Sequence, residues 1–503
     1  MLFDLNLEKR RMRALIIGAG IGGLTTAALL LKAGWQVTVL EAATYPGGCA
    51  ATFFHKNFHF DAGATLAGGF QPDGPHSRLA EILGLEWPVR PLCEAAWVVH
   101  LPGSTIHQWT DVERWRAEYR THFPYSAEFW KKQEQLAAIS WDLSSRNFPW
   151  PPASVREAGQ LLQGLRPATL LAAPYLMRSV RSMLPVETRP DFKAFIDAQL
   201  LISAQAVSDQ ANALYGSAVL DLPRRGVMAV SGGMGGIAET LVRWIRTHGG
   251  EVRYRQQVKS IETVRGSVWA VITDKEMRFE ADRFIGNLTP WGLRNLLGES
   301  APPGLMAETG SRRPMWGAFV LHVGLQNNSA WEHTHHQVVM DVNKPLDEGN
   351  SVFISLSPAD DPQRAPIGFR TSTLSTHTSA EVWNALSERD PDAYAQKKAE
   401  YTARLLEAAE VALPGFRKSV MLILPGTPAT YAFYTRRPLG MVGGFPQTSI
   451  LQARGPLTGL RNLWLVGDSI FPGQSTAGVT LGAIRVAGLV AGKSFQPAGS
   501  FFH

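Results

Sequence analysis

The chain has 503 residues, of which 45% are hydrophobic and 18% are charged. This composition is ordinary for a globular protein with a large core, so it excludes a disordered or low-complexity chain. The length indicates two or three domains.

The net charge of +6 and the pI near 9.3 are only mildly basic. No dense Lys/Arg tract with interleaved aromatic residues occurs, so we expect no nucleic acid partner. Two cysteines, Cys49 and Cys93, are too few for a disulfide framework and favour a reducing compartment such as the cytoplasm. No stretch is long and apolar enough to span a bilayer.

Residues 14–41 predict a strand, a glycine-rich turn, a helix and a second strand that ends at Glu41. Gly18 permits a tight turn, Gly20 lets the backbone approach a pyrophosphate, and Gly23 allows the helix to pack closely on the strand. Free N–H groups at the helix start would bind the pyrophosphate, and Glu41 would accept hydrogen bonds from ribose hydroxyls. The ordered set predicts dinucleotide binding rather than a glycine turn that binds nothing.

The segments that follow differ from one another in composition and in apolar pattern. Gly47 and Gly48 follow the second strand closely, and residues 58–63 predict a short strand entering a turn. Residues 110–225 carry many Trp, Pro and Arg residues with helical apolar patterns. Within them, residues 161–185 are notably apolar but are interrupted by Pro and Arg. This stretch is either a helix in a membrane interface with snorkelling arginines or a buried helix pair in a substrate domain.

From Gly226 onward, the pattern of glycine turns, strands and helices that is typical of the dinucleotide-binding segment returns. Residues 231–236 look like a second phosphate loop, but no acid-terminated strand follows them, so we expect a structural turn before a helix. Residues 281–291 predict a strand ending in a loop. Alternating runs in residues 315–375 predict an antiparallel sheet.

The last segment distinguishes between cofactors. A strand over residues 463–466 ends in Gly467 and Asp468, and a helix starts near residues 477–479. An Asp at a strand end can accept a hydrogen bond from a sugar alcohol, and a helix N-terminus can stabilise negative charge on a reduced flavin. By itself this pattern is an ordinary strand-to-turn transition. Paired with the Gly18 loop, it favours FAD over NAD, which needs no distant second site.

These motifs resemble the FAD-dependent carotenoid desaturase and isomerase family, a branch of the amine-oxidase-like flavoproteins. The resemblance covers nearly the whole chain and is carried by GAGIGGLTTAALLLKAGWQVTVLEAATYPGGCAATF, FHFDAGAT, SGGMGGIAETLVRWIRTHGGEVR, STLSTHT, GTPATYAFYTRRPLGMVGG and LWLVGDSIFPGQSTAGVTLGAIRVAG. The chain is most similar to the C-3',4' carotenoid desaturase group, through FDAGATLAGGFQPDGPHSRLAEILGL and AQLLISAQAVSDQANALYGSAVLDLPRRGVM. The prolycopene isomerase group is close behind.

The resemblance implies an α/β fold in which a discontinuous Rossmann-like FAD-binding domain carries an inserted α+β substrate domain. We expect FAD-binding segments at 10–109, 226–300 and 440–503, a helical, membrane-facing part at 110–225 and a substrate-domain sheet at 301–439. The residues expected to bind FAD are Gly18, Gly20, Gly22, Gly23, Glu41, Ala42, Gly47, Gly48, Val258, Gly467, Asp468, Ala477, Gly478 and Val479. The backbone of Val258 would meet the adenine, and residues 477–479 would approach the isoalloxazine ring.

The resemblance also implies a function. We expect a carotenoid desaturase that removes a hydride and a proton from an acyclic carotenoid, with oxygen or a quinone as the final acceptor and a peripheral position on a membrane. A carotenoid cis–trans isomerase using reduced FAD is the alternative, because the two activities share a fold and nearly all motifs. An amine oxidase and a non-catalytic lipid-binding escort protein are further alternatives.

No side chain is assigned as a catalytic acid or base, because a cation delocalised along a polyene needs positioning more than proton transfer. His377 is either a base or, as we favour, a loop residue. We expect His59 and Asp61 to shape the flavin pocket and Cys49 to pack beside the cofactor. We predict that His333, His335 and His336 lie in an exposed loop and bind no metal.

Overall fold

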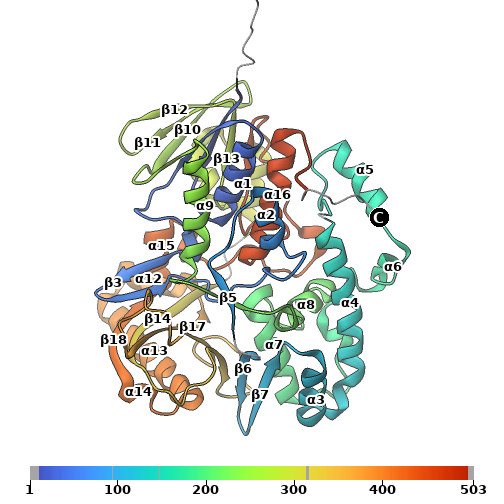
Figure 1. The fold of residues 1–503 in the computed structure, drawn as a ribbon, viewed down its shortest axis with the longest axis vertical. Coiled ribbons are helices and arrows are strands. Elements are labelled where there is room, and N and C mark those ends of the chain that lie inside the picture. Colours follow the sequence, from blue (N-terminus) through green and yellow to red (C-terminus); the bar gives the residue numbers. More distant parts are fainter. Residues whose placement is uncertain (1–10, 93–94, 147, 313–315, 497–503) are drawn as a thin grey trace, which may run out of the picture.

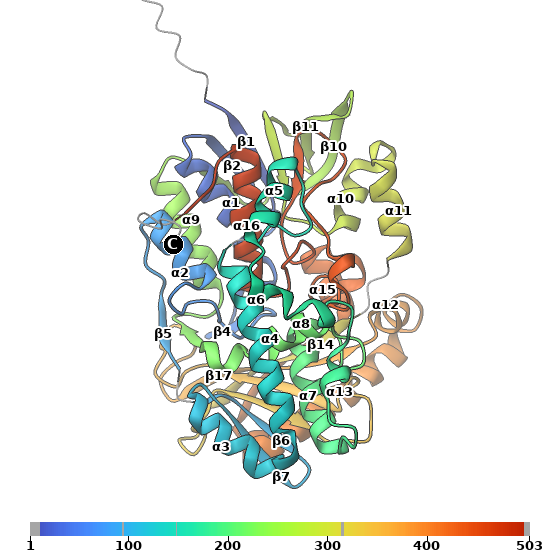
Figure 2. The ribbon, with the colours of Figure 1, turned by 90° about the vertical axis from the view of Figure 1, so that its right-hand side faces the viewer.

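The computed structural model describes residues 11–92, 95–146, 148–312 and 316–496 (Figure 1). A five-stranded sheet with its helices forms the upper half of the molecule in Figure 1, and a seven-stranded sheet forms the lower half. A group of helices, α3 to α8, covers the side that faces the viewer in Figure 2. These layers confirm the mixed α/β fold expected from the sequence.

The five-stranded sheet is parallel throughout and draws its strands from distant parts of the chain. Their spatial order is β19 (Leu463–Leu465), β13 (Arg283–Gly286), β1 (Arg13–Ile17), β2 (Gln36–Leu40) and β9 (Glu251–Arg253). The central strand β1 has the sequence RALII and is almost wholly buried. A continuous apolar run suits a parallel strand that is covered on both faces.

The alternation of side chains along β1 sets the two cores of this domain. Ala14 and Ile16 face the core formed with the helices α1 (Ile21–Lys32), α9 (Gly235–Thr247) and α16 (Thr476–Ala491). Leu15 and Ile17 face a second core. The elements of this second face are β10 (Val258–Val264), β11 (Ser267–Thr273), β12 (Arg278–Glu280), α10 (Pro290–Leu297) and α11 (Pro303–Ser311).

The seven-stranded sheet carries the inserted part of the chain, and most of its pairs are antiparallel, as expected for residues 315–375. Its strands in spatial order are β18 (Val420–Gly426), β14 (Gly317–Gln326), β17 (Phe369–Thr378), β16 (Ser351–Leu356), β15 (His335–Val339), β6 (Ala95–Leu101) and β7 (Ser104–Trp109). Four helices follow its later strands, namely α12 (Ala380–Arg389), α13 (Pro391–Ala412), α14 (Phe416–Ser419) and α15 (Pro428–Thr435).

The pairing of β6 differs from the domain boundary expected at residue 109. β6 pairs in parallel with β15, His336 opposite Val98, and β7 continues the same sheet. Residues 95–109 therefore lie with the substrate-domain sheet rather than with the first FAD-binding segment. The sequence gives no sign of this, because a β-hairpin reads the same whichever sheet it joins. The other expected divisions remain predictions.

Shorter elements link the two halves. They are the hairpin of β3 (Thr52–His55) and β4 (Phe58–Asp61), the helix α2 (Pro75–Leu83), and the pair of β5 (Val89–Pro91) and β8 (Met228–Val230). A buried ion pair fixes the β3–β4 hairpin to the inserted domain, with Arg364 Nη1 2.8 Å from Asp61 Oδ2. The carboxylate of Asp61 is therefore paired with a guanidinium of the inserted domain.

The helical part consists of α3 (Val112–His122), α4 (Ala127–Ser145), α5 (Val155–Gly164), α6 (Pro167–Leu170), α7 (Pro190–Ala204) and α8 (Ala213–Leu220). Residues 161–185 do not form a buried helix pair, since α6 is a single short helix and several apolar side chains around it are exposed. In the described part of the chain, no helix has both the length and the apolar character needed to cross a membrane.

Candidate functional site

The carboxyl ends of four parallel strands meet at one edge of the five-stranded sheet. Gly18 follows β1 directly, Glu41 follows β2, Asn287 follows β13, and Gly467 lies two residues after β19. In open α/β sheets ligands bind at this edge, where the strand order reverses direction. The structure therefore brings together residues that are more than 400 positions apart in the chain.

The glycine loop leaves no room for side chains. Gly18 has a left-handed φ of +97°, and Gly20 is the N-cap of α1 without any side-chain cap. A Cβ on Gly20 would lie 2.3 Å from Asn287 Nδ2, and a Cβ on Gly23 would lie 2.3 Å from the carbonyl oxygen of Gly18. Gly23 therefore permits the close packing of helix on strand, and the uncapped start of α1 fits an anionic pyrophosphate.

The other glycine turn that looked like a phosphate loop has no such free start. At the beginning of α9 the N–H groups of Gly232, Met234 and Gly235 donate to side chains of Asp361, Asp61 and Thr52. Because these donors are already satisfied, the turn is structural, in agreement with the sequence interpretation.

Asn287 is a site residue that the sequence analysis missed. Its Oδ1 lies 3.0 Å from the position of a Cβ on Gly22 and 3.1 Å from that of a Cβ on Gly467. Its amide therefore contacts both the first and the last segment of the site. The available signal was its place directly after a short apolar strand, in FIGNLTP, where a polar side chain reaches the carboxyl edge of a parallel sheet.

Glu41 is held by the glycine loop itself. Its carboxylate accepts hydrogen bonds from the N–H of Ala19, at 2.7 Å, and of Ala43, at 2.8 Å. The second glycine turn is attached to the same loop, because the N–H of Gly47 donates to the carbonyl of Ala19 at 2.8 Å. Gly47 and Gly48 both have positive φ angles, of 114° and 57°. The expected ribose and flavin-side residues thus lie beside the expected pyrophosphate loop.

The chain that leads to Val258 runs beside Glu41, Ala42 and Ala43. The N–H groups of Arg255 and Gln256 donate to the backbone carbonyls of Ala43 and Glu41. The chain then enters β10 at Val258, whose side chain packs in the same core as Leu15 and Leu40. Because the chain before Val258 runs beside Glu41, its position is compatible with the predicted contact between the backbone of Val258 and an adenine.

The start of α16 meets the glycine loop from the other end of the chain. Ser475 caps the helix, its Oγ accepting from the N–H of Gly478 at 3.0 Å. A Cβ on Gly22 would lie 3.0 Å from Val479 Cγ1, and one on Gly69 would lie 2.6 Å from Ala477 Cβ. The expected residues 477–479 are therefore adjacent to the first segment, as a single FAD site requires.

Asp468 has a partner that the sequence analysis did not find. Arg437, which follows α15, places Nη1 2.7 Å from Asp468 Oδ2 and 3.7 Å from Cys49 Sγ. Although burial lowers it, the pKa of Arg437 is raised overall by the negative charge of Asp468. Cys93 lies outside the described residues, so nothing structural follows about that thiol.

A small pocket of about 40 Å³ opens beside Asp468. Its lining includes Tyr215 of α8, Phe445 and Phe471, with Tyr215 and Phe471 ring centroids 5.8 Å apart. Polar side chains such as Gln447, Arg454 and Gln474 complete the lining, so the pocket is mixed in character.

His76 is a further residue that the sequence analysis missed. It is fully buried between the ring of Phe70, at 4.4 Å between centroids, and the first turns of α16. Its Nε2 lies 3.3 Å from Thr476 Oγ1 and its Nδ1 lies 3.4 Å from Thr480 Oγ1. Burial lowers the pKa of His76 to about 3, so the ring is neutral at pH 7. It ties α2 to α16.

Two expectations about histidines are wrong: that His377 lies in a loop, and that the histidines of residues 333–336 all lie in an exposed loop. His377 lies in strand β17, not in a loop, and its ring meets Trp316 edge-on at 5.6 Å. Burial lowers the pKa of His377 to about 4. His59 belongs to β4 and stacks edge-on against Phe54.

Of the three histidines expected in an exposed loop, His333 lies outside a strand and is half-buried, whereas His335 and His336 do not lie in a loop. His335 and His336 are buried in β15, where His335 Nδ1 lies 3.0 Å from Ser355 Oγ and His336 Nδ1 lies 3.2 Å from His100 Nε2. Two residues in a row can both be buried here because β15 is an interior strand of the sheet, covered on both faces. Among the described residues no cluster could hold a metal ion.

Comparison with known proteins defines the class of this site. The chain matches the family of flavin containing amine oxidoreductases over residues 21–491 and belongs to that family. It is an FAD-dependent oxidoreductase, and the expected resemblance to carotenoid desaturases and isomerases is confirmed.

Two relatives span almost the whole chain. The chain is 29% identical to "Prolycopene isomerase, chloroplastic" of Arabidopsis thaliana, over 95% of this chain and 82% of the relative. It is 26% identical to "Phytoene desaturase (lycopene-forming)" of Paracoccus sp. (strain N81106 / MBIC 01143), over 93% of this chain and 94% of the relative.

Solved structures share the fold. An oxidoreductase from Methanosarcina mazei superposes with a TM-score of 0.65 at 21% identity, covering 94% of this chain and 99% of the other. A putrescine oxidase with bound putrescine superposes with a TM-score of 0.60 at 17% identity, covering 96% and 99%. At these identities the likeness shows the fold alone.

Proposed function

We propose that the protein is an FAD-dependent carotenoid desaturase that removes a hydride and a proton from an acyclic carotenoid, with the C-3',4' bond as the point of attack. The observation that carries the proposal is the continuity of apolar side chains between an exposed patch on the helical part and the pocket beside Asp468. Such a path suits a long apolar substrate.

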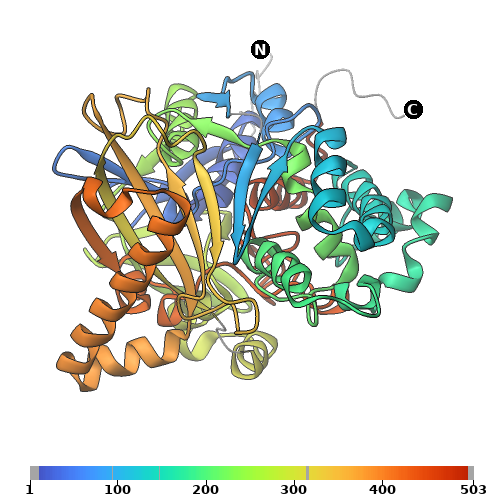
Figure 3. The same cartoon turned by 90° about the horizontal axis from the view of Figure 1, so that it is seen from below.

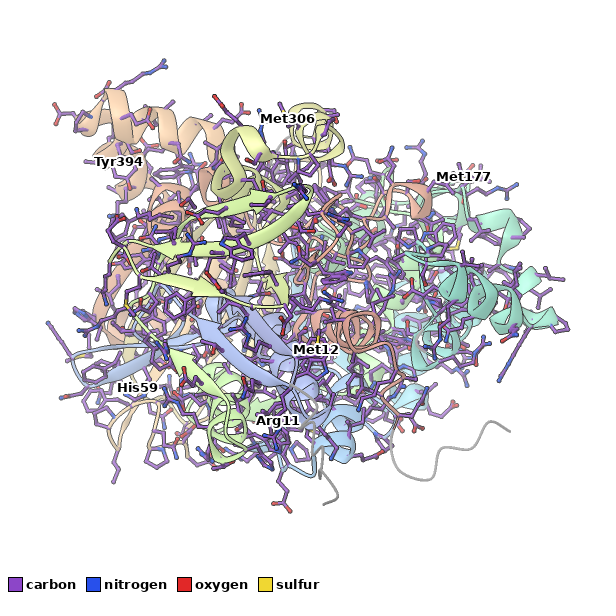
Figure 4. The ribbon with its side chains drawn as sticks, turned by 90° about the horizontal axis from the view of Figure 1, so that it is seen from above. Arg11, Met12, His59, Met177, Met306 and Tyr394 are labelled. Carbon is purple, nitrogen blue, oxygen red and sulfur yellow. The ribbon has the colours of Figure 1, made fainter. Side chains whose placement is uncertain are left out.

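The patch consists of large apolar side chains that are exposed on and around α5 and α6. Leu170 and Leu171 keep 66% and 71% of their surface exposed. We call the following set the apolar patch: Val155, Leu162, Leu165, Leu170, Leu171, Met177 and Val186. Figure 3 shows this helical part projecting beyond the two sheets, and Figure 4 labels Met177 on the same side.

Exposed arginines occur in the same stretch of chain as the apolar patch. The side chains of Arg166, Arg181 and Arg189 are more than half exposed, although each has an acidic partner. An apolar face bordered by arginines is typical of a surface that lies on an anionic lipid membrane. We therefore propose that the protein binds a membrane peripherally through this patch and takes its substrate from the lipid.

A core cluster joins the patch to the site. Ala172 and Leu214 belong to this cluster, and Tyr175, Leu176 and Ile450 pack against it. Leu214 precedes Tyr215, which lines the pocket beside Asp468. The route from lipid to flavin would thus pass between α6 and α8.

Bound FAD would supply the acceptor for the hydride. The chain would hold FAD through the glycine loop, Glu41, Asn287 and the start of α16, and would exclude water with Tyr215, Phe445 and Phe471. His76, packed against the start of α16, and His377, in β17, are neutral at pH 7 because desolvation lowers their pKa values to about 3 and 4. We assign no catalytic base, since positioning of the polyene would supply most of the rate.

A carotenoid cis–trans isomerase using reduced FAD is the second candidate. The observation that favours it is the 29% identity to a prolycopene isomerase over 95% of the chain. Purified holoenzyme should be incubated with an acyclic carotenoid in liposomes, with oxygen or a quinone as acceptor. A product with a longer chromophore and two fewer hydrogens supports desaturation. A product of unchanged mass with altered geometry supports isomerisation and contradicts the first proposal.

The membrane contact has its own test. The variant Leu170→Ser/Leu171→Ser should lose co-sedimentation with vesicles that contain anionic lipid. The variant Trp269→Ser removes an exposed aromatic side chain from β11, away from the apolar patch, and serves as the control. Equal sedimentation of all three proteins would contradict the proposed membrane face.

A further inference from the structure

Arg437 joins the first and the last segment of the candidate FAD site. It belongs to the link after α15, in the inserted part of the chain, yet its guanidinium reaches Asp468 from the last segment and Cys49 from the first. Its side chain is only 12% exposed. A buried arginine costs free energy unless its charge and donors are satisfied.

The partners of this guanidinium leave one donor open. Nη1 donates to Asp468 and Nη2 donates to the carbonyl of Gly443. Nε is buried and has no hydrogen-bond partner among the described residues. The guanidinium therefore retains an unused donor inside the region where the residues expected to bind FAD converge.

Cys49 does not neutralise this charge. The pKa of the Cys49 thiol is raised, because desolvation outweighs the attraction of Arg437, so the group stays a thiol at neutral pH. Asp468 is then the anionic partner that faces Arg437 in the described structure. If a sugar-alcohol hydroxyl also bonds to Asp468, the carboxylate must be held in one orientation, and the Nη1 contact at 2.7 Å does this.

We propose that Arg437 is a positioning residue of the FAD site: it orients the Asp468 carboxylate and adds a positive charge that favours the reduced, more negative flavin. This inference rests on the proposed use of FAD and deepens it. It also means that the inserted domain completes the cofactor site. A second link from α15, the Tyr431 hydroxyl donating to the carbonyl of Ala62 at 2.7 Å, holds the same segment against the first part of the chain.

The test compares a variant that removes the positive charge of Arg437 with a variant that removes the negative charge of Asp468. Arg437→Met should raise the dissociation constant for FAD at least tenfold, measured by flavin fluorescence, and should make the flavin reduction potential more negative. Arg437→Lys should restore much of the potential, because the charge returns without the planar fork. Asp468→Asn should move the potential in the positive direction, because Arg437 then lacks its counter-charge.

Arg436→Met is the matched control, since Arg436 is the exposed neighbour with the same charge. It should change neither the dissociation constant nor the potential. A merely structural ion pair would shift the potential equally, or not at all, in Arg437→Met and Asp468→Asn, and this outcome overturns the inference. If Arg437→Met fails to fold, Arg437→Lys and Asp468→Asn still decide the matter: a potential close to that of wild type in Arg437→Lys, together with a positive shift in Asp468→Asn, supports the inference, and an equal shift in both variants, or none in Asp468→Asn, overturns it.

The wild-type protein separates this inference from the proposal on which it rests. Wild type that neither carries flavin absorbance nor binds added FAD contradicts the use of FAD altogether. Wild type that binds FAD, alongside Arg437 variants with unchanged affinity and potential, contradicts only the role of Arg437.

Discussion

Arg485 in α16 and Glu157 in α5 form a buried, two-pronged ion pair. Arg485 Nη2 lies 2.7 Å from Glu157 Oε2, Nε lies 2.9 Å from Oε1, and each side chain is 6% exposed. Arg485 also donates to the carbonyls of Trp150 and Pro151. The pair therefore fastens the helix next to the apolar patch to the helix that starts at the flavin side of the site (Figure 2).

Removing one partner of this pair should be costly. Arg485→Met leaves the Glu157 carboxylate buried without its cation, and we expect a loss of about 3–5 kcal/mol in the free energy of unfolding. Thermal unfolding of the FAD-loaded protein measures it. The double variant Arg485→Met/Glu157→Leu should be more stable than the single one, because no buried charge remains. A single variant as stable as wild type would contradict this account.

Gly20→Ala should affect FAD binding more than folding. The new Cβ would lie 2.3 Å from the end of the Asn287 side chain, which can rotate away, and it would occupy the surface on which the pyrophosphate is expected. We expect the dissociation constant for FAD to rise more than tenfold, with little change in thermal stability. Gly304→Ala in α11 is the control, because a Cβ there meets no atom within 4 Å. Unchanged FAD affinity in Gly20→Ala would contradict the proposal that the glycine loop binds the pyrophosphate of FAD.

Gly23→Ala should behave differently from its neighbour. Its Cβ would lie 2.3 Å from the backbone oxygen of Gly18, which cannot rotate away. The helix α1 must then shift off strand β1, and we expect a loss of about 1–3 kcal/mol in stability, in addition to weaker FAD binding. Thermal unfolding without FAD shows the first effect. Stability equal to that of Gly20→Ala would show that the two glycines do not differ in this way.

Stability should fall in mild acid. Burial lowers the pKa of His76 and of His335 to about 3, whereas a histidine in an unfolded chain titrates near 6.5. Below pH 6.5 the unfolded chain therefore binds more protons than the folded one, so stability decreases as the pH falls from 6.5 toward 3. Each such group costs about 2 kcal/mol between pH 6.5 and pH 5. Thermal midpoints measured from pH 7.5 to pH 5 test this decrease.

A variant isolates one of these groups. His335→Gln removes one ionisable ring from β15, so its thermal midpoint should fall less steeply with acid than that of wild type. A midpoint that rises toward pH 5 in wild type, or a slope that His335→Gln leaves as steep, would contradict the linkage.

The sequence predicted the first βαβ unit and the final strand and helix closely, because each carries strong local signals. The glycine spacing and the apolar run of RALII determine β1 and α1 almost without help from the rest of the chain. Glu41 could be placed for the same reason, as it ends a strand that is adjacent in both sequence and space.

Residues that act through long-range contacts escaped prediction. Asn287 follows an unremarkable strand, and only the pairing of β13 with β1 brings it to Gly20. Arg437 lies in a polar link of the inserted domain, and its proximity to Asp468 depends on how two domains meet. β6 joined the larger sheet for a similar reason, since strand pairing across hundreds of residues leaves no local pattern.

The parallel sheet also dictates an order of events during synthesis. Its central strand β1 needs β13, which lies 269 residues later at Arg283 opposite Ala14, and the site needs β19 and α16, which come last of all. A ribosome adds about 5–20 residues per second, so β1 waits tens of seconds for β13, although β2 follows it almost at once. During that time its apolar faces are open to chaperones, and FAD can enter only after nearly the entire chain has emerged.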